Sequence, residues 1–304
     1  KCVMLIIIDK MTIDEQIVED IKQALRVEQV QAIILYVKRY LHSLDQKDAV
    51  NTHLLLENLN RKEREAFVQC YMQCVDMLDV EDFEKQRRKD ALITMSMDTQ
   101  LDQTPFLYAL TSYELHFNKI EDYVASHLCK MDQDQEKLFR LLSVVQVYAG
   151  CEVPLFVLQQ KTQLAIGRFR IENMLTPDQK TLLMRSATAL RTIHYCVAKG
   201  ILQYICGLHM KNKTAWRNNL QEVLSQTVQD LQPYHEHVEV SEIIQKIFLQ
   251  QTDTKIKGGH FADAIEELGT PEAKGEIFNL LCSAFPENPY VYSNRARYYH
   301  FLIK

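Results

Sequence analysis

The hydrophobic pattern near the start of the chain predicts two buried strands with a helix between them. Cys2–Asp9 (CVMLIIID) runs through seven apolar or sulphur-bearing residues without alternation, which is typical of a strand covered on both faces in a parallel sheet. Four-residue spacing of apolar positions predicts an amphipathic helix over Thr12–Val27. Val30–Val37 (VQAIILYV) predicts a second buried strand. Strand, helix and strand in this order predict a βαβ unit with parallel strands.

Helical patterns dominate after this unit. Asn60 and Glu63 have the spacing of a capping box and predict a helix over Arg61–Met77. Asp79–Lys89 is highly charged and predicts a solvated linker helix. A short helix is predicted to begin at Pro154. Longer helices are predicted at Ala91–Met97, Pro105–Leu115, Asn118–Leu128, Gln135–Tyr148, Tyr195–Cys206, Ala215–Leu231, Val240–Gln251, Phe261–Leu268, Glu272–Phe285 and Pro289–Ile303.

One segment interrupts these helices with a β pattern. Thr181–Arg185 and Ala189–Ile193 read as short strands on either side of a small polar turn, Ser186–Thr188. Helices, hairpin and a following helix are the order of a winged-helix domain. The last two predicted helices form an αα-hairpin similar to one tetratricopeptide unit, although no repeat period is visible.

Composition narrows the class of protein. The chain has 304 residues, 47% of them hydrophobic and 25% charged, with a net charge of −5. These values are ordinary for a globular protein and predict no general attraction to nucleic acid or to an anionic membrane. No apolar run approaches the length of about 18 residues expected of a membrane span. We expect a cytoplasmic protein. We also expect a fragment, because the chain begins inside a predicted strand and without Met.

The eight cysteines predict buried free thiols in a reducing compartment. Cys70 and Cys74 have the i, i+4 spacing of half a metal site, but packing in a core is the preferred interpretation because no second pair completes it. His235 and His237 are interpreted as part of a solvated linker. The charged stretch Asp79–Asp90, with Arg87 and Arg88, is interpreted as a solvated helix face.

Several short segments, in their order and spacing, resemble the sterile alpha motif domain-containing protein 9 family, vertebrate antiviral proteins built around a STAND-type P-loop NTPase. The matching segments are VMLIIID (Val3–Asp9), IILYVKR (Ile33–Arg39), LNRKEREAF (Leu59–Phe67), FNKIEDYV (Phe117–Val124), KLFRLLSVVQVY (Lys137–Tyr148), TIHYCVA (Thr192–Ala198), FADAIEEL (Phe261–Leu268) and FPENPYVYSNRARYYH (Phe285–His300).

The resemblance implies an α/β plus mostly α fold and an ATP- or ADP-controlled molecular switch in cytosolic innate defence. It divides the chain into the C-terminal part of a parallel-sheet P-loop NTPase domain (1–78), a helical linker domain (79–131), a winged-helix domain (132–210) and a helical region leading into tetratricopeptide-like repeats (211–304). Protein partners are implied for the helical region, and self-association is a further possibility.

The resemblance also implies three nucleotide-sensing residues. Asp9, at the carboxyl end of the first strand, would support Mg²⁺ beside the phosphates. Arg39, or alternatively Lys38, would sense the γ-phosphate. His194, after the hairpin, would contact the ADP phosphates in the resting state. The alternatives are a solvated Asp9, a solvated Arg39 and a His194 buried at a strand–helix junction.

Two features depart from the family pattern. The phosphate-binding motif G-x-x-x-x-G-K-[ST] does not occur in the sequence, and the resemblance locates it before Lys1. The acid that usually follows Asp9 is Lys10 here, which favours slow or absent hydrolysis, so enzyme activity stays open. The alternative function is a catalytically inactive helical scaffold that binds proteins. Nucleic-acid binding by the basic residues of 154–208 is the less favoured interpretation of that segment.

Overall fold

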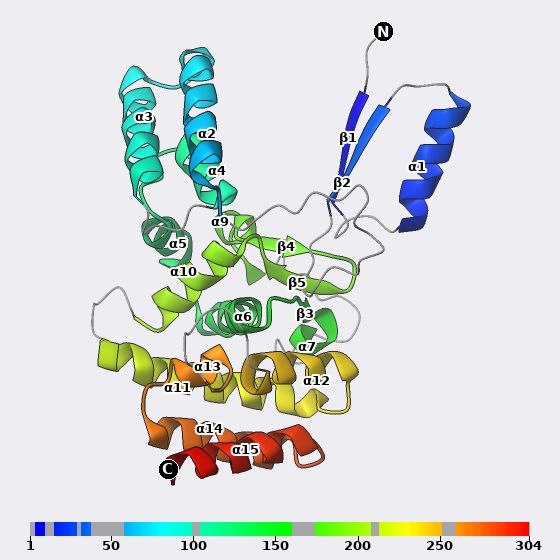
Figure 1. Ribbon diagram of the computed structural model, residues 1–304, viewed down its shortest axis with the longest axis vertical. Helices are drawn as coiled ribbons and strands as arrows, with labels where there is room; N and C mark the ends of the chain where they lie inside the picture. Colours follow the sequence, from blue (N-terminus) through cyan, green and yellow to red (C-terminus); the bar gives the residue numbers. More distant parts are fainter. Residues whose placement is uncertain are drawn as a thin grey trace.

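The computed structural model describes residues 4–9, 15–28, 32–37, 58–98, 104–159, 174–207, 213–250 and 260–303 (Figure 1). Over these residues the protein is mostly helical. The strands are β1 (Met4–Asp9), β2 (Ala32–Val37), β3 (Val153–Pro154), β4 (Leu183–Arg185) and β5 (Ala189–Thr192). The α-helices are α1 (Glu15–Val27), α2 (Arg61–Cys74), α3 (Asp82–Met97), α4 (Pro105–Tyr113), α5 (Ile120–Leu128), α6 (Gln133–Val144), α7 (Leu155–Gln159), α9 (Pro177–Thr181), α10 (Tyr195–Ile205), α11 (Lys213–Leu231), α12 (Val238–Ile244), α13 (Asp263–Glu266), α14 (Pro271–Ala284) and α15 (Pro289–Leu302).

The first two strands pair in parallel, as the hydrophobic pattern predicted. Met4 lies opposite Ala32 and Asp9 lies opposite Val37, and α1 connects the strands. The described strands lie within the predicted ranges Cys2–Asp9 and Val30–Val37. Among the described residues no other strand joins this pair, so the parallel sheet seen here consists of β1 and β2 alone.

Helices α2, α3 and α4 form a small bundle with a hydrophobic core of its own. Asn60 caps α2: its side chain accepts from the Glu63 amide (3.1 Å), and the Glu63 carboxylate accepts from the Asn60 amide (2.7 Å). A 3₁₀ turn, η2 (Val75–Met77), extends α2 to the predicted end of the helix. The side chains at the centre of this core are Tyr71, Val75, Leu92 and Tyr108.

The predicted solvated linker helix proves to be wrong. Asp79–Lys89 and Ala91–Met97 were expected as separate segments, but Asp82–Met97 is one helix, α3. Its Glu84 and Arg88 are buried, with 4% and 2% of their surface exposed. Two charged residues of α3, Glu84 and Arg88, therefore face inward, and they form an ion pair across one helical turn.

The predicted hairpin is confirmed. Strands β4 and β5 pair antiparallel, with Leu183 opposite Thr192. The short β3 joins the other edge of β5, so the sheet has the order β3–β5–β4. Pro154 was predicted to begin a helix; instead it ends β3, and α7 begins at Leu155. A strand of two residues is too short to produce a visible hydrophobic period.

The second and larger core extends from α5 to α15. Figure 1 shows α6 and the three-stranded sheet above a layer of α11, α12 and α13, with the antiparallel pair α14 and α15 below it. Two π-helical segments, η3 (Val145–Ala149) and η6 (Gln245–Leu249), continue α6 and α12 and pack against each other. A 3₁₀ turn, η5 (Gln232–Tyr234), follows α11. Gly150, with φ of 63°, ends η3 in the left-handed conformation that glycine adopts readily.

The αα-hairpin predicted at the end of the sequence is confirmed by α14 and α15. Val291 and Tyr298 of α15 face α14 and the main core, and Tyr298 lies 5.3 Å from the ring centre of Phe278. Within the described residues, no helix has both the length and the apolar character that crossing a membrane requires.

Candidate functional site

His194 is the predicted site residue whose side chain is described, and it lies at the start of α10. Its Nδ1 accepts a hydrogen bond from the Cys196 amide at 3.1 Å, so His194 is the N-cap of this helix. An Nδ1 that accepts carries no proton, and in the neutral ring the proton then lies on Nε2. The imidazole stacks on Phe106 of α4, with ring centres 4.2 Å apart and planes at 9°.

A buried polar network holds the backbone that leads from the hairpin to His194. Gln146, on the π-helical segment η3, accepts at Oε1 from the Thr192 amide (2.9 Å) and lies 2.6 Å from the Thr192 hydroxyl. The same hydroxyl lies 3.0 Å from the His194 carbonyl oxygen. Thr192 is fully buried and Gln146 nearly so. Because buried polar groups are costly to leave unpaired, this network fixes the exit of β5 and the start of α10.

Asp9 ends β1 at the carboxyl edge of the strand pair, beside Val37 of β2. The backbone thus brings Asp9 close in register to the end of the second strand, two residues before Arg39. Arg39, Lys38 and Lys10 lie outside the described residues. The proposed approach of Asp9, Arg39 and His194 to one ligand stays a prediction.

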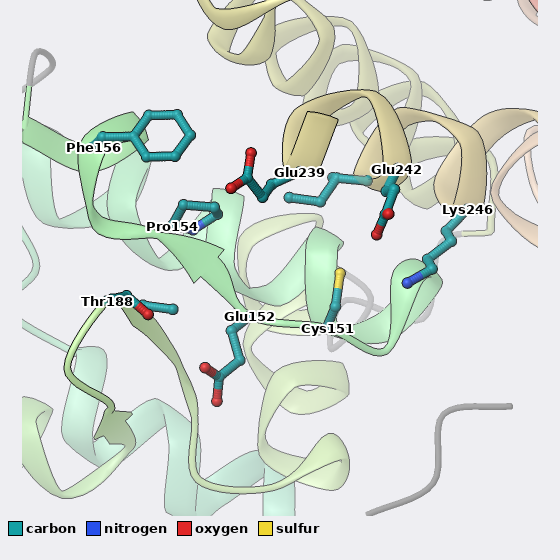
Figure 2. Close-up of a pocket in the computed structure, with 10 residues that line it drawn as sticks. Cys151, Glu152, Pro154, Phe156, Thr188, Glu239, Glu242 and Lys246 are labelled. Atoms are coloured by element: carbon teal, nitrogen blue, oxygen red, sulfur yellow. The ribbon is translucent and has the colours of Figure 1, made fainter. Parts of the chain in front are cut away.

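A cavity of about 390 Å³ lies between the β3 edge of the three-stranded sheet and α12 (Figure 2). The sheet side contributes mainly apolar groups, and α12 with η6 contributes charged ones. Figure 2 shows the Glu152 carboxylate directed away from those of Glu239 and Glu242. The lining residues are Cys151, Glu152, Pro154, Phe156, Thr188, Ala189, Glu239, Glu242, Ile243 and Lys246.

Two potentially reactive side chains in the lining of this cavity are held in unreactive states. Burial raises the pKa of the Cys151 thiol to about 11, so at neutral pH it is protonated and a poor nucleophile. Glu152 pairs with the buried Arg191 at 3.0 Å and accepts a hydrogen bond from Ser186 at 3.2 Å. These two contacts hold its carboxylate against the sheet. Neither Cys151 nor Glu152 is therefore an activated nucleophile.

Arg191 also bears on nucleic-acid binding. It was one of the basic residues counted for the segment 154–208, but only 4% of its surface is exposed and its guanidinium faces Glu152. A buried, paired arginine cannot contact phosphates without breaking its ion pair. This weakens the case for nucleic-acid binding through the hairpin.

The most strongly perturbed acid among the described residues is Glu84, which sequence reasoning placed on a solvated face. Arg87 donates to both of its oxygens (2.8 and 2.7 Å), Arg88 donates at 2.9 Å, and the His116 amide donates at 3.3 Å. Hydrogen bonds from Arg87, followed by those from Arg88, lower the pKa of Glu84 to about 2. Arg87 also donates to the Phe117 carbonyl.

The Glu84 cluster ties α3 to the turn before α5. His116 in this turn has a φ of 57°, an unusual conformation for a residue other than glycine. The hydrogen bonds to Glu84 come from two arginines and a backbone amide, and the His116 Nδ1 lies 3.9 Å away, so we interpret the cluster as structural. The i, i+4 spacing of Glu84 and Arg88 could have suggested an ion pair, but nothing in the sequence indicated that it is buried.

The cysteine predictions are partly wrong. Cys196, Cys206 and Cys282 are buried free thiols as expected, but Cys70, Cys74 and Cys129 are exposed. Packing of Cys70 and Cys74 in a core is therefore contradicted. His235 and His237 are exposed, as the linker interpretation expected. In the described part of the chain, no group of three or more His, Cys, Asp or Glu side chains is placed to hold a metal ion.

Comparison with known proteins identifies no relative: no family model, no curated protein and no solved structure matches this chain.

Proposed function

We propose that the chain is part of a STAND-type nucleotide switch that acts in cytosolic innate defence and responds to ATP or ADP with Mg²⁺. The proposal rests on the resemblance of its short segments to that family. One structural observation supports it most. Along the chain, helix α6 is followed by β3, by further helices and by the β4–β5 hairpin. The three strands form one sheet, and His194 caps the helix α10 that follows. This is the order of a winged helix, with its histidine at the position that the resemblance implies.

The local chemistry of His194 suits a phosphate contact. Its Nδ1 accepts from the Cys196 amide, so in the neutral ring the proton that can be donated lies on Nε2. The first turn of α10 adds backbone amides and the positive end of the helix dipole, which favour an anion. In this proposal Nε2 donates to a phosphate oxygen of ADP in the resting state, and exchange for ATP releases it.

The parallel strand pair supports the second half of the proposal. β1 and β2 run side by side and end at Asp9 and Val37, and ligands of α/β sheets bind at the carboxyl ends of the strands. Asp9 would support Mg²⁺ through water, and Arg39 would sense the γ-phosphate. With Lys10 after Asp9 in place of a second acid, binding rather than turnover carries the signal.

The test is the nucleotide content of the intact protein as isolated from its native source. Acid extraction and chromatography of the extract are expected to release close to one ADP per chain. Protein that carries no nucleotide, and binds none when ADP and Mg²⁺ are added, would exclude the switch.

The second candidate function is a helical scaffold that binds other proteins and uses no nucleotide. The exposed apolar side chains of α15 favour it, because Tyr290 and Leu302 are 61% and 49% exposed, and Ile303 just after it is 85% exposed. The same nucleotide extraction separates the two: the scaffold is expected to yield none.

A further inference from the structure

Helix α2 and the turn that follows it present three sulphur-containing side chains to solvent on one side. Cys70 and Cys74 are exposed, and Met77, in the turn that follows the helix, is 77% exposed. Spacings of four and three residues bring side chains to the same side of a helix, one turn apart. Tyr71 and Val75, their neighbours in sequence, are buried in the α2–α4 core. The sulphur atoms therefore lie on the flank of the helix next to that core.

Neither thiol has a competing role in the described structure. Among the described residues, no hydrogen bond or ion pair involves Cys70 or Cys74, whereas the exposed thiol of Cys129 donates to the Ser126 carbonyl at 3.4 Å. A disulfide within the helix is also disfavoured. Residues four apart on a helix have Cβ atoms about 5–6 Å apart, and a disulfide needs about 3.5–4.5 Å. The two residues thus persist as a dithiol.

We propose that Cys70 and Cys74 chelate a soft monovalent cation, Cu(I), with the Met77 thioether as a third donor. Thiolates and thioethers select Cu(I) among biological metals. Structural zinc requires four ligands, and no group of three or more His, Cys, Asp or Glu side chains in the described part of the chain can supply them. Cu(I) accepts a lower coordination number. On binding, two thiol protons pass to solvent, Cu(I) exchanges its solvent or chelator ligands for two thiolates and one thioether, and three Cu–S bonds form without a change in the oxidation state of copper.

The experiment is an anaerobic titration of the reduced protein with Cu(I) against bathocuproine disulfonate, whose coloured copper complex reports the copper that the protein does not take. The wild type is expected to hold one Cu(I) per chain in competition with the chelator. Cys70→Ser and Cys74→Ser are each expected to weaken binding by more than about tenfold, since the loss of even an outer partner of a ligand costs 10- to 100-fold. Met77→Leu is expected to weaken it less.

Cys129→Ser is the matched control, because Cys129, the C-cap of α5, is also an exposed thiol but has no second cysteine one turn away. Its copper affinity should equal that of the wild type. Thermal unfolding followed by circular dichroism shows that each variant is folded. The proposal is overturned if the chelator removes all copper from the wild type, if Cys129→Ser loses as much affinity as Cys70→Ser, or if zinc is held as tightly as copper in a parallel titration.

Discussion

The imidazole of His194 and the ring of Phe106 lie face to face, with centres 4.2 Å apart and planes at 9°. Phe106 belongs to α4 of the small bundle, and His194 follows the hairpin of the larger body. Thr104, the N-cap of α4, lies 3.7 Å from the sulphur of Cys196 in the first turn of α10. The proposed nucleotide contact is thus made at a junction between two separate hydrophobic cores.

Substitution of His194 separates its two roles. His194→Ala removes the cap and the imidazole, and is expected to lower the free energy of unfolding by about 1 kcal/mol. His194→Asn keeps an oxygen that can accept from the Cys196 amide, so its stability should stay near that of the wild type. Under the proposed function both variants weaken ADP affinity by about tenfold or more, because a hydrogen bond to a charged group contributes about 1.5–3 kcal/mol.

Isothermal titration with ADP and Mg²⁺ on the intact protein, together with urea denaturation, measures both quantities. Unchanged ADP affinity in His194→Asn would leave the histidine with a capping role only.

Glu84→Gln is expected to destabilise the α2–α4 bundle by about 3 kcal/mol, since it leaves the buried Arg88 and the partly exposed Arg87 without their charge partner. Asp82→Asn, at an exposed position on the same helix, is the control. Its pairing with Lys85 at 3.8 Å is on the surface, and the change should stay within about 0.5 kcal/mol. Urea denaturation followed by circular dichroism measures the two variants; equal effects would contradict the structural importance of the buried cluster.

The same acid predicts how stability depends on pH. Arg87 and Arg88 lower the pKa of Glu84 to about 2 from an ordinary 4.5. A lowered folded-state pKa means that the unfolded chain binds the proton first, so the stabilisation is complete above pH 4.5 and declines as pH falls toward 2. The difference in unfolding free energy between wild type and Glu84→Gln should shrink over this range. A difference that stays constant from pH 6 to pH 2.5 would argue against the ion cluster.

Two glycines predict opposite responses to alanine. Gly269 has a φ of 78°, and a Cβ there would lie 2.5 Å from Nε of Arg217. The arginine can move, but the left-handed backbone still costs an alanine about 1–2 kcal/mol. Gly275 lies within α14, where the nearest atom to an added Cβ is 3.6 Å away. Gly275→Ala should therefore stabilise the protein by up to about 1 kcal/mol. Thermal melting of both variants tests the sign of each change.

Thiol reactivity gives a test of the fold that needs no substitution. Exposed Cys70, Cys74 and Cys129 should react with iodoacetamide first at pH 7.5. Cys151 and Cys206 should react slowly, because burial raises their pKa values to about 11 and about 12. Peptide mass spectrometry over a time course measures the order of labelling. Early modification of Cys206 would contradict the packing of α10 against the core.

Local signals in the sequence predicted most of the secondary structure. The Asn60–Glu63 capping box and the polar turn before β5 both appear where they were predicted. Each depends on hydrogen bonds or dihedral angles within about four residues, so the spacing of residue types is enough to specify it. The two continuous hydrophobic runs also predicted the parallel pairing of β1 and β2.

Tertiary structure alone decided which polar and sulphur side chains are buried. Glu84 and Arg88 looked solvated and are buried, while Cys70 and Cys74 looked buried and are exposed. The side of a helix that becomes covered depends on contacts with segments that are distant in the sequence. The residue pattern of the helix itself does not specify those contacts. The stacking of His194 on Phe106 was likewise decided by tertiary structure, because it depends on how two separate hydrophobic cores meet.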